Sequence, residues 1–196
     1  MRNLTLAIVL IILGLVILVP GCNTYNKLVD LDENVENAWG KVESDYQRRA
    51  DLIPNLVNTV KGVADFEQET LTAVTQARAR ATSVNIDPSN LSAEKLAEFQ
   101  QAQGQLSQSL GRLLVAVERY PELKANQSFL ELQAQLEGTE NRIKVARNNY
   151  NDVVTQYNKA VRRFPNSLFA GIFGFDRRAQ FEAEAGAEEA PEVNFE

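Results

Sequence analysis

The segment LVDLDENVENAWGKVESDYQRRADLIPNLVNTVKGV, residues 28–63, decides the fold class of this 196-residue chain. Its apolar side chains recur at steps of three and four residues, the spacing of one face of an α-helix. That face consists of Leu28, Leu31, Val35, Ala38, Val42, Tyr46, Ile53, Leu56, Val60 and Val63, widened by Trp39 and Val57. A stripe of this breadth is typical of a helix that packs against a core.

Helical spacing continues through most of the remaining chain. It recurs in residues 66–82, 96–117 and 129–164, and these segments are bounded by Pro88, Pro121 and Pro165. Proline disfavours continuation of a helix, and short connections join antiparallel neighbours. We therefore predict an all-α, membrane-anchored up-and-down bundle of four helices, with a turn near Gly62. The count falls to three if the first two helices are continuous.

The N-terminus carries an unbroken apolar run that begins at Leu4 and ends at Val19, preceded by Arg2. A helix that continues to Tyr25 would be about 33 Å long, enough for a hydrocarbon core of about 30 Å. We predict residues 1–25 as a membrane anchor, with Tyr25 at the headgroups. An alternative stays open: a small residue before the single Cys22 also resembles the cleavage site of a lipoprotein signal, in which Cys22 would be lipidated.

Positive charge around the anchor bears on its orientation. Arg2 and the terminal amine stand on one side, and Lys27 stands on the other, followed by acidic residues. The positive-inside rule then favours a cytoplasmic N-terminus and a bundle outside the cytoplasm. We predict a single-pass membrane protein, with membrane lipid as one partner.

Composition argues against several function classes. The chain has no histidine and one cysteine, which removes the commonest general base, the commonest zinc ligand and any internal disulfide. We therefore expect no enzyme, no cofactor and no metal site. The formal charge of −6 comes from six glutamates in residues 179–196, which we predict as an acidic disordered tail. The rest is neutral overall, so no nucleic-acid partner is expected.

Polar residues interrupt the apolar stripes at a few positions. Arg49 falls between Tyr46 and Ile53, Glu140 falls in the last helix, and Gln103 takes an apolar position in the third. Charged side chains inside a core need partners. The candidates for a carboxylate–guanidinium site are Arg49, Asp51, Glu140, Asn141 and Arg142. The other interpretation of the same residues is a structural polar network that fixes helix register.

A second apolar segment follows Pro165. Residues 166–178 contain Phe169, Ile172, Phe173 and Phe175 and are too few to span a bilayer. They could cover the open end of the bundle. Alternatively, they form a contact with the membrane or with a partner protein, because exposed apolar patches usually mark one.

Several motifs together resemble the LemA family. They are RRADLIPNLV at residues 48–57, YPELKAN at 120–126, TENRI at 139–143, ARNNYN at 146–151 and FGF at 173–175. The resemblance implies a bacterial single-span membrane protein, with residues 26–165 as the helical bundle. It supplies a fold and a location but no catalytic residues.

Three functional hypotheses follow. The first is a membrane-tethered scaffold that packs against partner proteins. The second is a self-assembling or membrane-shaping protein, which would form homo-oligomers. The third is a carboxylate-dependent enzyme centred on Glu140.

Overall fold

The computed structural model describes residues 2–62 and 66–182, with side chains from Gly21 onward except that of Asn90. The long helices are α1 (Arg2–Lys61), α2 (Gln68–Ser83), α3 (Ala93–Val117) and α5 (Gln127–Arg162). The short ones are the 3-10 helix η1 (Pro88–Asn90), α4 (Pro121–Lys124) and α6 (Asn166–Phe173). Every regular element in the described part is helical, which confirms the predicted all-α class.

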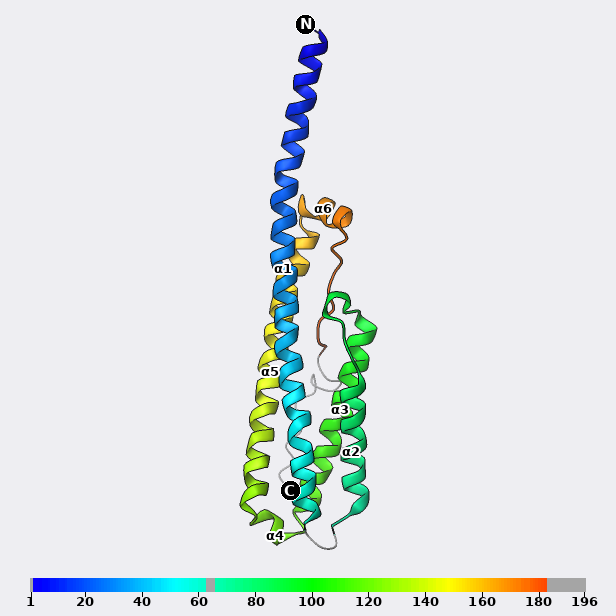
Figure 1. The fold of residues 1–196 in the computed structure, drawn as a ribbon, viewed down its shortest axis with the longest axis vertical. Helices are drawn as coiled ribbons and strands as arrows, with labels where there is room; N and C mark the ends of the chain where they lie inside the picture. The colour runs from blue at the N-terminus through cyan, green and yellow to red at the C-terminus, as the bar shows by residue number, and fades with distance from the viewer. Residues whose placement is uncertain (1, 63–65, 183–196) are drawn as a thin grey trace, which may run out of the picture.

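The first two helices are separate. Helix α1 ends at Lys61 and α2 begins at Gln68, so the described part contains four long helices. They run alternately up and down along one axis in Figure 1. Helix α1 itself continues without interruption through Pro20 and Pro54.

Local sequence explains where the later helices begin. The Ser92 hydroxyl accepts a hydrogen bond from the Lys95 N–H at 3.3 Å and caps α3. The Asn126 carboxamide accepts from the Phe129 N–H at 3.1 Å and caps α5. Both side chains satisfy a backbone donor that has no partner inside its helix. Pro121 starts α4, where a missing N–H is harmless.

The apolar stripes build two hydrophobic clusters rather than one. The distal core joins all four long helices and includes Ile53, Leu56, Val60, Leu71, Val74, Leu106, Leu113, Phe129 and Leu136. The proximal core lies toward the N-terminal part of α1 and includes Leu28, Val35, Trp39, Val42, Phe99, Ile143, Tyr150, Tyr157 and Phe181. Tyr46 and Ile53 therefore belong to different clusters, and Arg49 lies between them.

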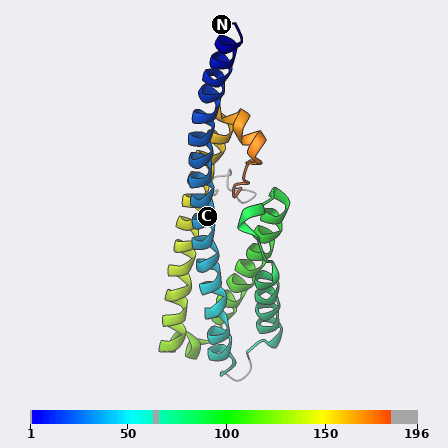
Figure 2. The same ribbon diagram turned by 45° about the horizontal axis from the view of Figure 1, so that its top comes forward.

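The two helix pairs differ in length. Helices α2 and α3 have 16 and 25 residues, whereas α5 has 36 and α1 has 60. Figures 1 and 2 show α1 and α5 extending beyond the ends of α2 and α3, toward α6. In this proximal half, the inner face of α1 and α5 is covered by η1, α6 and the non-helical residues 175–182, which we call the strap.

The strap corrects one predicted boundary. We placed the start of the disordered tail at residue 179, but Ala179 packs against the proximal core and Phe181 is only 6% exposed. An aromatic ring inside an acidic stretch still gains free energy from burial. Residues 183–196 lie outside the described part.

Most of the predicted anchor falls on residues whose side chains lie outside the described part. In the described part of the chain, we find no helix that is both long and apolar enough to cross a membrane. Leu4 and Val19 lie in α1 but among the residues whose side chains are not described. Tyr25 is described and is 43% exposed. Cys22 is an exposed free thiol.

Candidate functional site

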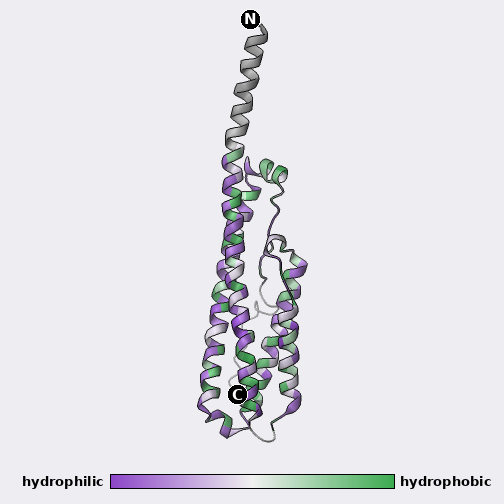
Figure 3. Cartoon of the chain, viewed as in Figure 1, coloured by the Kyte–Doolittle hydropathy of each residue, from purple (hydrophilic) through white to green (hydrophobic). Residues whose placement is uncertain are grey.

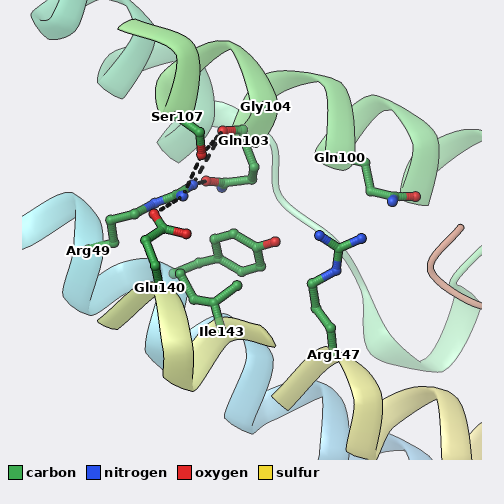
Figure 4. Close-up of a pocket in the computed structure, with 9 residues that line it drawn as sticks. Arg49, Gln100, Gln103, Gly104, Ser107, Glu140, Ile143 and Arg147 are labelled. Carbon is green, nitrogen blue, oxygen red and sulfur yellow. Dashed lines mark hydrogen bonds and ion pairs between the residues drawn. The ribbon is translucent and has the colours of Figure 1, made fainter. Parts of the chain in front are cut away.

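Arg49 is the centre of a polar layer between the two cores. Its side chain comes from α1 and is 1% exposed. Nη1 donates to Glu140 Oε1 at 2.6 Å and to Ser107 Oγ at 2.9 Å. Nη2 donates to Gln103 Oε1 at 2.6 Å (Figure 4). Charge-assisted hydrogen bonds of this length are the strong ones, so the guanidinium is firmly held.

The layer connects all four long helices. Arg49 lies on α1, Gln103 and Ser107 on α3, and Glu140 on α5. Gln103 also donates from Nε2 to the carbonyl oxygen of Ala81 at 3.2 Å, which brings in the last turn of α2. Because each bond has one favourable geometry, the layer fixes how the helices align along the bundle axis.

A cavity of about 140 Å³ adjoins the layer. Its polar lining includes Tyr46, Gln100 and Arg147 beside Arg49 and Glu140 (Figure 4). Burial raises the pKa of the Tyr46 hydroxyl, although Arg147 and Arg49 oppose the shift. The guanidinium of Arg49 lies 5.0 Å from the centre of the Tyr46 ring. Tyr46 is therefore a neutral hydrogen-bonding group at neutral pH.

The chemistry available in this cavity is narrow. Its lining includes one carboxylate, Glu140, whose side chain is 47% exposed. A pair of carboxylates with different pKa values is the usual means of acid–base catalysis without histidine. No group of three or more potential metal ligands occurs within the described residues. What the structure does show is a set of side-chain hydrogen bonds from Arg49 to α3 and α5, which is the arrangement of a structural layer.

The structure brings together only two of the five residues considered for a carboxylate–guanidinium site. Arg49 and Glu140 form the ion pair. Asp51 is exposed and accepts from Gln47 Nε2 at 2.8 Å, while Asn141 and Arg142 are exposed and line an outer groove. Helical periodicity explains the difference, because residues adjacent in sequence to a buried one point to other faces.

Gln103 and Ser107 complete the layer and were not among the predicted site residues. Gln103 could have been assigned to the polar layer from the sequence, since it occupies a position of its helix where the stripe is otherwise apolar. Ser107 gives no such signal. It follows the buried Leu106, is itself exposed, and reaches Arg49 from the edge of α3.

The second candidate site is helix α6, which lies against the proximal part of α1. Phe169 packs on Gly21, where an added Cβ would come within 3.0 Å of its ring. The Tyr25 ring lies 5.0 Å from that of Phe173 and 5.8 Å from that of Phe175. Ile172 instead points outward and is 73% exposed. Three of the four residues predicted for a contact thus pack at least partly on α1.

These observations define a class: an all-helical bundle of four antiparallel helices, joined by a buried arginine layer and extended at one end by a single long helix. A family model described as the LemA family matches residues 38–195. The chain belongs to the LemA family, as its motifs predicted.

Known relatives are similar over most of the chain. The protein LemA of Metamycoplasma hominis is 25% identical over 158 residues, covering 81% of this chain and 68% of the relative. The magnetosome protein MamQ 2 of Paramagnetospirillum magneticum is 26% identical over 184 residues, covering 85% and 67%. The magnetosome protein MamQ of Magnetospirillum gryphiswaldense is 25% identical over 174 residues, covering 80% and 64%.

Proposed function

We propose that this protein is a membrane-tethered scaffold, in which α1 serves as both the anchor and the longest helix of the bundle. The observation that carries the proposal is the continuity of α1 from Arg2 to Lys61. Because one helix contains the apolar run and one edge of both cores, the bundle would stand directly on the membrane without a flexible linker.

The continuity of α1 favours a transmembrane span over a cleaved lipoprotein signal. The helix continues through Pro20 and Cys22 into the bundle. From Leu4 to Tyr25 it would be about 33 Å long, which matches the hydrocarbon core and the nearby headgroups. Cleavage before Cys22 would remove Gly21, on which Phe169 packs.

Helix α6 supports a second contact with lipid. Phe164, Leu168 and Ile172 are 81%, 59% and 73% exposed, respectively, and α6 is mostly green in Figure 3. Arg162 and Arg163, both exposed, precede it. Apolar side chains beside basic ones are typical of helices that lie in a membrane interface with anionic headgroups. Contacts of α6 with Gly21 and Tyr25 place it where the apolar run of α1 ends.

A scaffold role is also consistent with the names of the relatives. MamQ is named as a magnetosome protein and LemA is not named for a reaction, so neither name denotes an enzyme. The scaffold would act by presenting the bundle surface to partner proteins. The bundle is proposed to lie outside the cytoplasm, since the positive charge at Arg2 precedes the anchor.

The test is the location and mass of the protein in bacteria. Full-length protein should stay in the membrane after alkaline extraction, and residues 27–196 should be recovered in the soluble fraction. The intact mass should include Met1 and should be unchanged, apart from one atom of sulfur replaced by oxygen, in Cys22→Ser. Recovery of the fragment in the membrane after alkaline extraction, which removes peripheral contacts such as that proposed for α6, contradicts the anchor. A mass beginning at an acylated Cys22 contradicts the span and supports lipidation.

The α6 contact has its own test in liposomes. A fluorescent label at Ile172 should be quenched by lipid-borne quenchers, whereas a label at Val115, which is 72% exposed in the distal half, should not. Equal accessibility of both labels to an aqueous quencher would reject the lipid contact.

A further inference from the structure

The strap is held in a groove that the unequal helix lengths create. Helix α2 ends at Ser83 and α3 begins at Ala93, so they leave part of the inner face of α1 and α5 uncovered. The strap enters this groove after Gly174, which adopts φ +76° and ends α6. In Figure 1 it runs lengthwise from α6 toward the N-terminal end of α3. Gly174 is suited to this turn because it lacks a Cβ.

Two asparagines of α5 bind the main chain of the strap. Asn158 accepts from the Arg178 N–H at 3.0 Å and donates to its carbonyl at 2.9 Å. Asn151 accepts from the Phe181 N–H at 2.9 Å and donates to its carbonyl at 3.0 Å. Each carboxamide thus forms a two-bond pair with one residue, as a neighbouring β-strand would.

The spacing of the two asparagines matches an extended peptide. They are seven residues apart on a helix, which is about 10.5 Å at 1.5 Å per residue. Arg178 and Phe181 are three residues apart, which is about 10 Å in an extended chain. Between them, the Tyr150 hydroxyl donates to the Ala179 carbonyl at 3.0 Å. The groove therefore recognises main chain in an extended conformation.

Phe181 and Arg178, which are buried and half-buried in the groove, give this recognition most of its specificity. The exposed Gln180 adds hydrogen bonds from Nε2 to the Asn151 carbonyl at 2.9 Å and to Thr155 Oγ1 at 2.7 Å. The Phe181 ring stacks on Trp39 with 5.9 Å between centroids and meets the Tyr150 ring edge to face at 5.4 Å. Arg178 forms an ion pair with Asp32 of α1 at 2.8 Å, and these side chains are 12% and 22% exposed. Arg177 is exposed. The pattern that the groove selects is Arg-x-x-Phe.

We propose that this groove is a peptide-binding site for extended Arg-x-x-Phe segments, and that it accepts the strap of a second copy of this chain in place of its own. The groove residues belong to helices, whereas the strap is non-helical and is connected to α6 through the turn at Gly174. A second copy carries the one segment already shown to fit. Exchange of an identical element preserves every contact and is a low-cost route to dimers.

The strap of the same chain competes strongly. A tethered ligand acts at an effective concentration in the millimolar range, so exchange needs crowded copies. The proposed membrane anchor would provide that crowding, and the inference rests on the proposed function in this respect. Binding of the peptide itself does not require a membrane, so the test below can fail independently of the anchor.

The first experiment measures peptide binding to the full chain in detergent. Phe181→Ala vacates the aromatic pocket, and Arg178→Ala loosens the strap without removing a core ring, in case the first variant loses helicity. A labelled peptide of residues 175–182 should bind either variant at least about ten-fold more tightly than wild type, where the tethered strap competes. Trp39, the sole tryptophan, should report binding by fluorescence. Absence of binding to both folded variants overturns the site.

Matched variants test the recognition. Adding Asn151→Ala to the chain should weaken peptide binding about ten-fold, since two hydrogen bonds are lost on a helix that tolerates alanine. A peptide with Phe181→Ala should bind at least about ten-fold more weakly, whereas one with Arg177→Ala should bind like the original. Equal binding of all peptides would show non-specific adhesion and overturn the proposed pattern.

The second experiment asks whether another copy is the source. Full-length Asn151→Ala has an intact strap and a weakened groove. Full-length Phe181→Ala has an intact groove and a weakened strap. Mixed together, they should form cross-linkable heterodimers at concentrations where each alone stays monomeric. A chain that carries both substitutions, alone or mixed with wild type, should form less dimer than the mixture of the two single variants. If the peptide binds but the mixture stays monomeric, exchange between copies is rejected.

Discussion

The distal and proximal halves of the bundle are held together by different interactions. In the distal half, four helices bury apolar stripes against one another, as Leu106 and Leu113 illustrate with 0% exposure. In the proximal half, α1, α5 and the start of α3 also share an apolar cluster, but the strap is bound there in addition through carboxamides, a tyrosine and an ion pair. Apolar packing in the distal half involves a continuous stripe along each helix, whereas the strap is bound through separate contacts of individual residues. The strap of the proximal half is therefore the element that we propose to be exchangeable.

The arginine layer separates the two halves, and its removal should have the largest effect. Arg49→Ala should lower the free energy of unfolding by about 4 kcal/mol, because it leaves a cavity and deprives Gln103 and Ser107 of their donors. Urea denaturation followed by circular dichroism measures the loss. Since the layer contacts all four helices, both halves should melt together at the lower denaturant concentration.

A double substitution serves as the control. Arg49→Met with Glu140→Met should lose only about 1–2 kcal/mol, since an apolar side chain then replaces the buried guanidinium and its half-exposed carboxylate partner is removed with it. If Arg49→Ala is no less stable than this double variant, the layer does not join the two cores.

The next largest effect should be confined to the proximal half. Phe181→Ala should destabilise the strap and its surroundings by about 3 kcal/mol, because it empties an aromatic pocket. Leu113→Ala in the distal core removes a side chain of 0% exposure and should lower global stability by a similar amount. Hydrogen exchange distinguishes them: Phe181→Ala should expose amides near Trp39 and Tyr150 only. Uniform loss of protection in Phe181→Ala would mean that the halves are not separable.

The same difference explains what the sequence could predict. Apolar residues at helical spacing predicted the long helices, and Pro121 and Pro165 lie at the predicted breaks. Gln103 stood out because it was polar in an apolar stripe. Apolar periodicity carries this information because burial of one helix face is repeated every turn.

The strap could not be predicted in this way. Asn151 and Asn158 lie on a helix rich in polar residues, where an asparagine that binds main chain looks like one that binds water. Phe181 stands alone, next to a run of glutamates whose composition is typical of disorder. A single ring that packs on two aromatic residues, Trp39 and Tyr150, has no periodicity. The groove that binds Phe181 gave no signal in the sequence either, because its residues do not repeat at a regular spacing.

Tyrosine ionisation offers a smaller test of the proximal half. Burial raises the pKa of Tyr150 to about 12, against about 10 in an unfolded chain. The unfolded state then releases its proton first, so stability is complete below pH 10 and falls as the pH rises from 10 to 12. The contribution of Tyr150 to this loss should approach about 2 kcal/mol at pH 11.5. Urea midpoints at pH 8, 10 and 11.5 would measure the total loss.

Substitution assigns that pH dependence to a residue. Tyr150→Phe should reduce the alkaline loss but not abolish it, because burial raises the pKa of Tyr157 to about 12 as well. An alkaline loss that is the same in Tyr150→Phe as in wild type would place its origin outside the strap groove.

Ion pairs give the smallest contrast between the halves. Arg178 and Asp32 pair at 2.8 Å with side chains 12% and 22% exposed, whereas Arg119 and Glu67 pair at 2.5 Å at the distal end with side chains 65% and 42% exposed. Water and salt screen the exposed pair, so proximity alone does not make it stabilising. Asp32→Asn should lower stability by about 1 kcal/mol and loosen the strap, as reported by Trp39 fluorescence. The matched Glu67→Gln should leave the melting temperature unchanged. Equal effects of the two substitutions would remove the electrostatic part of the distinction, and the strap would then depend on its asparagine bonds and on Phe181.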